Sequence, residues 1–420
     1  MISLIEVLGY RSLRYNRQPV GPFHVLIGPN ASGKTTFLDV VSFLGKLVGD
    51  GVESAVRERT ENFRDLLWGR DGTHFELAIE ATLPDRIREK LTLKTLASIR
   101  YEVDIGIAEE SDTAEVGILS ERVYLIPARE FNQVPRFSFP APVDPPDTIL
   151  HKSARGWNLV VSKNLGGYDN FTPENKSKTR KSWTHSFKLG PRKSALGNLP
   201  PDETQFPACT WLKNLLAEGV QPFLLNSLLM RRPSPPNQRP GFRTDGSNLP
   251  WVVRDLKSRR SDRYAEWLGH LQTALPDLAQ IDTVVRREDR HCYVVLEYQG
   301  GLRIPSWMAS DGTLRLLALT LPAYIPDFQG IYLIEEPENG IHPKAVETVF
   351  QSLSSVYDAQ LLLASHSPVI LGCALPESVL CFAKNEDGAT DIVSGPNHPQ
   401  LRQWKRETNL GVLFAAGVLG

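Results

Sequence analysis

Three segments of the chain alternate hydrophobic and polar side chains, and their period of two is typical of strands with one buried face. The pattern predicts half-buried, antiparallel strands in the N-terminal part of the chain. These segments are residues 73–80, 99–107 and 116–126, and residues 1–8 also read as a strand.

Other segments are continuous apolar runs, at residues 23–27, 331–334 and 360–364. Such runs predict parallel strands that lie at the centre of a sheet and are covered by helices on both faces. Residues 35–44 and 310–321 carry helical patterns, and residues 86–96 favour a short helix. The chain is therefore predicted to have an α/β fold with a mainly parallel central sheet and an antiparallel β-subdomain.

The middle of the chain has a different character, because 17 of the 31 prolines lie between Pro127 and Pro250. Only residues 210–217 and 223–230 read as helical there, and the prolines exclude a long coiled coil. Helices at 251–257 and 264–275 and a strand pair at 283–285 and 293–297 follow. We expect an N-terminal lobe (1–126), a proline-rich, loop-rich inserted arm or lid region (127–264) and a C-terminal lobe (265–420).

Composition narrows the class of protein. A hydrophobic fraction of 41%, a charged fraction of 23% and a net charge of −1 are typical of a globular protein without a global preference for nucleic acid. The four cysteines are far apart, which predicts buried thiols and no zinc site. The chain has neither a signal-peptide pattern nor a run of 18 apolar residues, so we expect a cytoplasmic protein with no membrane contact.

A phosphate-binding motif joins the first apolar strand to the first helix. Residues 28–36 fit G-x-x-x-x-G-K-[ST], and their backbone N–H groups and helix N-terminus would surround phosphate oxygens. Lys34 would reach the β- and γ-phosphates, and Thr35 would bind Mg²⁺. The alternative is a chance match. The predicted nucleotide-binding residues are Gly28, Pro29, Asn30, Ala31, Ser32, Gly33, Lys34, Thr35 and Thr36.

Two further strands end in groups suited to phosphate chemistry. Glu335 and Glu336 follow 331–334, and His366 follows 360–364. Ligands of parallel α/β sheets bind at the carboxyl ends of strands, so these groups are predicted to meet the phosphate loop. Glu335 would hold Mg²⁺, Glu336 would deprotonate the attacking water, and His366 would sense the γ-phosphate. The alternatives are a solvated acidic turn and a capping or core histidine.

Residues 310–313 (S-D-G-T) combine a hydroxyl, a glycine and a helix start, which together can bind an anion. The alternative is a simple N-cap by Ser310.

The order of these motifs resembles ABC-type ATPase heads, most closely the RecF, structural-maintenance-of-chromosomes (SMC) and OLD group of standalone AAA-family ATPases. Residues 9–13 (GYRSL) are similar to that group's N-terminal element, which implies that Arg11 approaches the nucleotide. Residues 335–343 (EEPENGIHP) and 364–368 (ASHSP) resemble its Walker B/D-loop and histidine switch. The resemblance covers residues 1–126 and 265–385. It implies ATP and Mg²⁺ as cofactors, Lys34, Glu336 and His366 as catalytic residues, and Ser310 and Gly312 acting in trans in a head-to-tail dimer.

The sequence departs from the family pattern at two points. Glu335 replaces the usual aspartate, and residues 37–130 contain no glutamine, so the usual glutamine-loop ligand has no counterpart there. The spacing between Lys34 and Ser310 differs from that of transporter subunits. Only 54 residues follow His366, without the spaced acidic cluster of an appended nuclease.

The inserted region is locally basic and aromatic, a combination that suits phosphate and base contacts in nucleic acids. Its candidate residues are Lys176, Lys178, Arg180, Lys181 and Trp183, and a second basic run lies at 231–263. The alternatives are a solvated face or a docking surface for an acidic protein.

Together these patterns predict an ATP-hydrolysing head that dimerises on ATP, senses or acts on nucleic acid, and works beside a separate effector, such as a nuclease or toxin, in anti-phage defence or DNA maintenance. The alternative is a nucleotide-dependent scaffold or sensor that holds and releases an effector protein with little hydrolysis.

Overall fold

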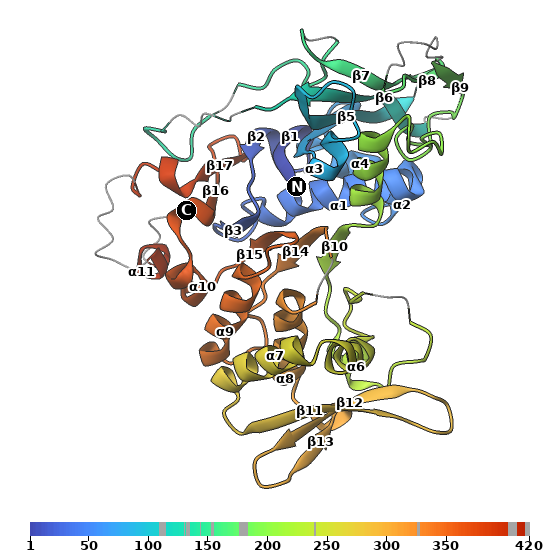
Figure 1. The fold of residues 1–420 in the computed structure, drawn as a ribbon. Coiled ribbons are helices and arrows are strands. Elements are labelled where there is room, and N and C mark those ends of the chain that lie inside the picture. The colour runs from blue at the N-terminus through green and yellow to red at the C-terminus, as the bar shows by residue number, and fades with distance from the viewer. Residues whose placement is uncertain are drawn as a thin grey trace. The chain divides into compact units, whose positions relative to one another are not determined.

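In the computed structural model the chain forms two compact units (Figure 1). The first comprises Met1–Val220 and a returning segment that begins at Pro376, and the second begins at Gln221 and runs to Leu375. The structure describes residues 1–108, 115–129, 131, 135–142, 144–152, 155–175, 184–238, 241–325, 328–401 and 410–415.

An eight-stranded sheet dominates the first unit, and all its neighbouring strands are antiparallel, as the alternating pattern predicted. Its spatial order is β2-β1-β4-β5-β6-β7-β8-β9. The strands are β1 (Ile2–Tyr10), β2 (Leu13–Pro19), β4 (His74–Thr82), β5 (Leu96–Ala108), β6 (Glu115–Pro127), β7 (Asn158–Asn164), β8 (Asp169–Phe171) and β9 (His185–Phe187). The last three lie in the stretch expected to be a loop-rich insert, so a proline-rich arm is not confirmed.

Both faces of this sheet are buried around β4 and β5, which corrects the prediction of half-buried strands. On one face, Tyr10 and Phe75 pack against Phe43, with ring centroids 4.9 to 5.8 Å apart. The opposite face carries charged side chains that are also buried, among them Arg100 and Glu102. Polar side chains can be buried there because hydrogen bonds and opposite charges compensate for the loss of hydration.

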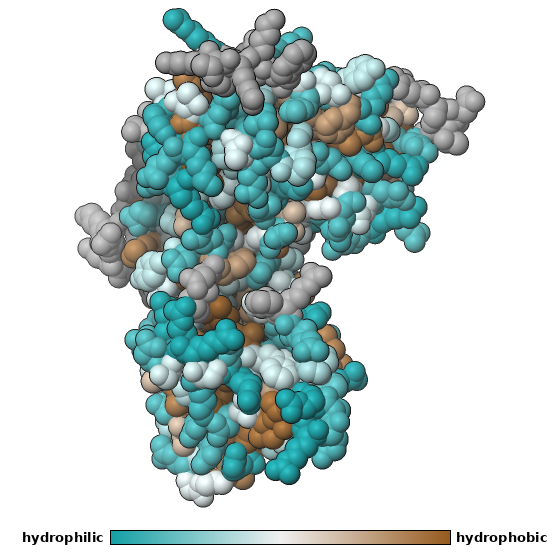
Figure 2. All heavy atoms as spheres, turned by 45° about the vertical axis from the view of Figure 1, so that its right-hand side comes forward, coloured by the Kyte–Doolittle hydropathy of each residue, from teal (hydrophilic) through white to brown (hydrophobic). Residues whose placement is uncertain are grey.

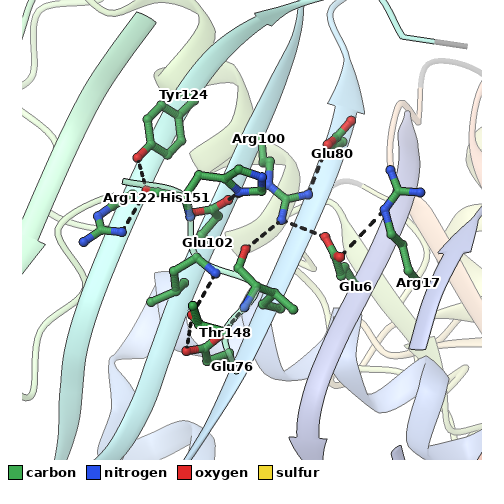
Figure 3. A network of polar contacts seen from close by, with 12 residues as sticks. Glu6, Arg17, Glu76, Glu80, Arg100, Glu102, Arg122, Tyr124, Thr148 and His151 are labelled. Atoms are coloured by element: carbon green, nitrogen blue, oxygen red, sulfur yellow. Dashed lines mark hydrogen bonds and ion pairs between the residues drawn. The ribbon is translucent and has the colours of Figure 1, made fainter. Parts of the chain in front are cut away.

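Arg100 is the centre of this polar network (Figure 3). Its guanidinium forms ion pairs with Glu6, Glu80 and Glu102 at 2.6 to 3.1 Å. Glu102 in turn accepts hydrogen bonds from the backbone N–H and the ring of His151. Burial lowers the pKa of Arg100, but the carboxylates outweigh it and the pKa is raised overall. The network thus attaches the segment around His151 to this polar face of the sheet.

The helices of the first unit are α1 (Lys34–Asp50), α2 (Val52–Arg57), α3 (Asp85–Arg88) and α4 (Pro207–Ala217). Helices α1 and α4 lie side by side (Figure 1), and a Cβ at Gly45 of α1 would come within 2.7 Å of the Leu216 carbonyl oxygen. A glycine is therefore required where these helices meet. Helix α3 is much shorter than the 86–96 segment predicted to be helical.

The strand before the phosphate loop, β3 (Phe23–Ile27), pairs in parallel with β16 (Val379–Lys384), which pairs antiparallel with β17 (Thr390–Ser394). The returning segment thereby places residues from the end of the chain beside the phosphate loop.

The second unit contains the parallel strand pair β14 (Ile331–Glu335) and β15 (Gln360–Ala364), which confirms the interpretation of the two apolar runs. A three-stranded antiparallel sheet has the order β11 (Leu278–Val285), β12 (Cys292–Tyr298), β13 (Arg303–Pro305). A further strand, β10 (Val220–Phe223), begins where the first unit ends. The helices are α5 (Ser227–Arg231), α6 (Leu249–Arg259), α7 (Ser261–Ala274), α8 (Asp311–Thr320), α9 (Pro343–Ser354), α10 (Pro368–Cys373) and α11 (Leu410–Ala415).

A buried polar contact connects three helices of the second unit. Trp267 of α7 is fully buried and donates its Nε1 hydrogen to Thr320 Oγ1 of α8 at 2.9 Å. Ser352 of α9 donates to the Thr320 carbonyl oxygen at 2.7 Å. These bonds fix the helix whose N-terminus carries Ser310.

The visible surface is mostly hydrophilic, with hydrophobic groups scattered over it (Figure 2). No helix in the described part of the chain combines the length and the apolar character that crossing a membrane requires. All four cysteines are free thiols; three are buried, and Cys373 is partly exposed.

Candidate functional site

The phosphate loop has the backbone that its glycines predict. Gly28 and Gly33 have φ angles of 148° and 105°, which favour glycine. A Cβ at Gly28 would lie 2.1 Å from the Phe382 carbonyl oxygen, and one at Gly33 would lie 2.2 Å from Thr390 Oγ1. The loop therefore turns tightly against β16 and β17 and leads directly into α1.

Lys34, the first residue of α1, folds back over this loop. Its Nζ donates to the carbonyl oxygens of Gly28 and Pro29, each at 2.8 Å, and the side chain is only 6% exposed. The charge is thus held above the loop, where phosphate oxygens of a nucleotide would bind.

Ser32 supports the fit of the loop to a phosphate group. Its Oγ is buried and makes no hydrogen bond within the described residues. A buried hydroxyl without a partner costs free energy, and a phosphate oxygen would satisfy it. With the two positive-φ glycines and Lys34, this hydroxyl fits the phosphates of a nucleotide.

Arg11, which the family resemblance places near the nucleotide, is held by Asp39 of α1. Its Nη1 lies 3.0 Å from Asp39 Oδ2, and its φ of 50° puts the turn in the left-handed region. Tyr10 donates its hydroxyl to the same oxygen at 2.6 Å, while Arg59 Nε donates to Oδ1 at 2.7 Å. Burial, followed by Asp39, raises the pKa of Tyr10 well above its usual value, so its hydroxyl stays protonated.

Thr390 of β17 joins the Arg11 turn to the phosphate loop. Its Oγ1 donates to the Ser32 carbonyl oxygen at 2.9 Å and lies 3.0 Å from Ser12 Oγ. Its backbone N–H donates to the Ser12 carbonyl oxygen at 2.9 Å. The loop is therefore supported from the end of the chain, 358 residues away from Ser32.

In the second unit, Glu335 and Glu336 are exposed at the end of β14. Glu336 has a φ of 47°, and its backbone N–H donates to the Ala364 carbonyl oxygen at 2.8 Å. Its carboxylate accepts a hydrogen bond from Asn339. The carboxylates are therefore accessible, as coordination of Mg²⁺ and activation of water would require.

Glu338 connects the acidic turn to the loop that carries His366. Its Oε1 accepts hydrogen bonds from Ser365 Oγ at 2.8 Å and from the His366 backbone N–H at 2.9 Å. Ser365 Oγ also accepts from the Ser367 N–H at 2.9 Å, so the loop after β15 is fixed around this one carboxylate.

Ser310 acts as the N-cap of α8, as the simple reading of S-D-G-T allowed. Its Oγ accepts from the Thr313 N–H at 3.1 Å, and its side chain is exposed. A Cβ at Gly312 would lie 2.6 Å from the Gly340 carbonyl oxygen, so α8 begins directly against the turn after β14.

The structure therefore brings the predicted residues together in two groups. The first unit assembles Arg11, residues 28–36 and their supports; the second assembles Ser310, Gly312, residues 335–338 and His366. Their union at one nucleotide remains a prediction. Sequence reasoning missed the supporting residues Asp39, Arg59, Thr390 and Glu338, because none of them lies in a motif that identifies its partner.

The basic candidates have mixed outcomes. Lys176, Lys178, Arg180, Lys181 and Trp183 lie outside the described residues. Elsewhere in this stretch, Lys163 is buried in an ion pair with Asp169, and Arg192 pairs with Glu53 and Glu115. In the second basic run, Arg231 pairs with Asp311. Several of the cations therefore have internal partners.

The fold of the chain is similar to that of a solved SMC head domain. It is similar to the crystal structure of an Smc head bound to the C-winged helix domain of ScpA, with a TM-score of 0.53 and 12% identity over 94% of this chain and 97% of that chain. An Smc head with an extended coiled coil bound to the C-terminal domain of ScpA, from Pyrococcus furiosus, gives 0.49 and 12% over 94% and 96%. The Smc head from Thermotoga maritima gives 0.42 and 8% over 94% and 98%.

The family is given by the sequence itself. Residues 23–372 match the family described as "AAA domain, putative AbiEii toxin, Type IV TA system", and the chain belongs to that family. The expected resemblance to ABC-type ATPase heads is thus confirmed.

Proposed function

We propose that this protein binds ATP with Mg²⁺ and hydrolyses it in a head-to-tail dimer. The observation that carries the proposal is the phosphate loop, with Lys34 held over the Gly28 and Pro29 carbonyl oxygens and the Ser32 hydroxyl buried without a partner. Membership of an AAA-domain family supports the same assignment.

The roles proposed for the residues rest on their motifs and on the family resemblance. Lys34 and the loop N–H groups would bind the phosphates, and Thr35 and Glu335 would hold the Mg²⁺. Glu336 would orient the attacking water and accept its proton, and His366 would contact the γ-phosphate. The bound Mg²⁺ would neutralise charge on the phosphate oxygens.

Two variants with different expected results test this function. Lys34→Ala should abolish ATP binding, because the phosphates lose their counter-charge. Glu336→Gln should bind ATP with near-parental affinity, hydrolyse it at least about 100-fold more slowly, since general-base catalysis contributes 10²- to 10⁴-fold, and accumulate as an ATP-bound dimer. Nucleotide binding, phosphate release and mass in solution measure the three properties. Parental hydrolysis by Glu336→Gln would overturn the assignment of the base.

We further propose a separate protein partner, and a role in anti-phage defence or DNA maintenance. The family description names a type IV toxin–antitoxin system, and an Smc head of similar fold is bound to a domain of ScpA. These comparisons support a head that acts through another protein. Nucleic acid remains a second ligand in this proposal, through residues 176–183.

One observation favours a slower, sensor-like version of the same head, which would hold an effector and release it with little hydrolysis. One oxygen of the exposed Glu336 carboxylate, Oε2, already accepts a hydrogen bond from Asn339, which weakens that oxygen as a base. Tight ATP binding without measurable steady-state turnover by the parental protein would select this alternative.

A further inference from the structure

The face of the eight-stranded sheet that carries Arg100 also carries a second group of ionisable side chains. Their chemistry differs from that of the phosphate loop. His74 and Glu76 project from the same face of β4, and Asp104 lies directly opposite Glu76 on β5. One imidazole nitrogen and two carboxylate oxygens of these residues lie within 4.8 Å of one another.

The charges of this group are not balanced, unlike those of the neighbouring rows. On the same face, Glu102 lies in the next pair of facing residues, and Glu80 lies in the pair after that. The carboxylates of both residues form ion pairs with Arg100. Among the described residues, no lysine or arginine forms an ion pair with Glu76 or Asp104. Two carboxylates that face each other across a strand pair repel when no cation separates them.

The hydrogen bonding of the group is also incomplete. Glu76 is 3% exposed and accepts hydrogen bonds from Thr148 Oγ1 at 2.7 and 2.9 Å and from the Ile149 N–H at 2.6 Å. Asp104 Oδ1, by contrast, is inaccessible to solvent and accepts no hydrogen bond from any described residue. A buried carboxylate oxygen without a partner is costly unless a ligand satisfies it.

We propose that His74, Glu76 and Asp104 bind a divalent transition-metal ion, separate from the Mg²⁺ that accompanies ATP. The mixed donor set favours Mn²⁺ or Zn²⁺ over Mg²⁺ and Ca²⁺, which prefer all-oxygen sites. His74 is exposed, so water completes the coordination from the solvent side. The ion supplies the positive charge that Arg100 provides in the neighbouring rows.

The site has a structural consequence for the segment above it. Glu76 accepts hydrogen bonds from Thr148 and Ile149, and Glu102 accepts one from His151. Both carboxylates therefore hold the same segment, residues 148–151, against the sheet. A cation that fixes Glu76 and Asp104 therefore strengthens the attachment of residues 148–151 to the sheet. Metal binding should raise the melting temperature of the protein.

The test uses the full chain without nucleotide, so that the phosphate loop has no reason to hold a cation. Titration with MnCl₂, followed by the loss of the free Mn²⁺ paramagnetic resonance signal, and equilibrium dialysis against ZnCl₂ measure affinity and stoichiometry. We expect one ion per chain. Asp104→Asn and His74→Gln should each weaken binding by at least about 10-fold, because each replaces a carboxylate or imidazole ligand with a weaker, neutral amide.

A matched control is a second histidine–aspartate pair, His291 and Asp289, whose Nδ1 and Oδ2 lie 3.2 Å apart. Within the described part of the chain this pair belongs to no group of three possible metal ligands, so Asp289→Asn should leave the affinity unchanged. His74→Gln decides the matter if Asp104→Asn fails to fold, because His74 is exposed. No stoichiometric binding by the parental chain, or equal affinity in all variants, would overturn the site. Neither result depends on ATP hydrolysis.

Discussion

Individual residues were predictable from the sequence where a local motif determines them. Lys34 and Gly33 stand at fixed positions of the phosphate loop, and their geometry follows from the loop itself. Glu338 could not be found in this way, since its partners Ser365 and His366 are 27 and 28 residues further along the chain. The metal donors were missed for a similar reason: His74 and Asp104 meet only through strand pairing.

Glu338 provides the prediction at this scale. Its carboxylate orients the loop that carries His366, so Glu338→Ala should lower kcat about 10- to 100-fold while the KM for ATP changes little, because catalytic geometry is sensitive to small displacements. Glu338→Gln should retain most of the activity, since its amide oxygen can still accept both hydrogen bonds. Steady-state ATPase measurements distinguish the two variants.

The control is the exposed Glu347 of α9, whose replacement by alanine should leave kcat unaltered. Parental turnover by Glu338→Ala would show that the hydrogen bonds to Ser365 and His366 do not matter for catalysis.

At the scale of elements, periodicity predicted most long strands and helices but failed where distant contacts decide. Helix α3 ends after one turn because Lys94 Nζ donates to the carbonyl oxygens of Arg88 and Glu89, while Thr92 N–H donates to Asn175. The short strands β7 to β9 gave no recognisable pattern. The polar face of β4 and β5 predicted exposure, yet Arg100 and its carboxylates are buried by a segment that periodicity cannot locate.

The N-terminus of α4 leads to a prediction about pH. The buried Glu174 carboxylate accepts hydrogen bonds from the backbone N–H groups of Ala208 and Cys209, each at 2.8 Å. Burial raises the pKa of Glu174 from 4.5 to about 7, against the opposing effect of those N–H groups. Between these values the native state binds more protons than the unfolded state, so the contribution of Glu174 to stability is greatest at low pH and falls as the pH rises.

The difference in pKa corresponds to a loss of about 3 kcal/mol in the free energy of unfolding between pH 4 and pH 8. Denaturant unfolding at several pH values measures it. Glu174→Gln should remove this part of the pH dependence, whereas Glu203→Gln, at an exposed position before the same helix, should not. The same pH dependence in Glu174→Gln and the parental protein would contradict the prediction.

At the scale of the whole molecule, the motifs follow the chain in the order phosphate loop, S-D-G-T, acidic turn and histidine. This order predicted an ATPase head, and the match to an AAA-domain family agrees with it. The division into two units, one closed by the returning segment at Pro376, was not predictable from local patterns. Pairing of β3 with β16 joins residues more than 350 positions apart, and neither strand indicates its partner.

The assembly of two chains gives the last prediction. If Ser310 faces the nucleotide of a second chain, Ser310→Arg should bind ATP as a single chain but fail to dimerise or hydrolyse. Ser310 is the better position for this test than Gly312, because a side chain at Gly312 would meet the Gly340 carbonyl oxygen and disturb its own fold. Ser310→Ala is the matched control: it loses the N-cap, at a cost of about 1 kcal/mol, without blocking the surface.

Mixing Ser310→Arg chains with Lys34→Ala chains then tests the head-to-tail arrangement directly. In a mixed dimer, the intact phosphate loop of the Ser310→Arg chain faces the intact Ser310 of the Lys34→Ala chain, which leaves one complete site. We expect ATPase activity to return in the mixture and to rise with the fraction of mixed dimers, measured by differently tagged chains. Activity that stays absent when mixed dimers are demonstrated, or that survives in Ser310→Arg alone, would contradict a site completed by the second chain.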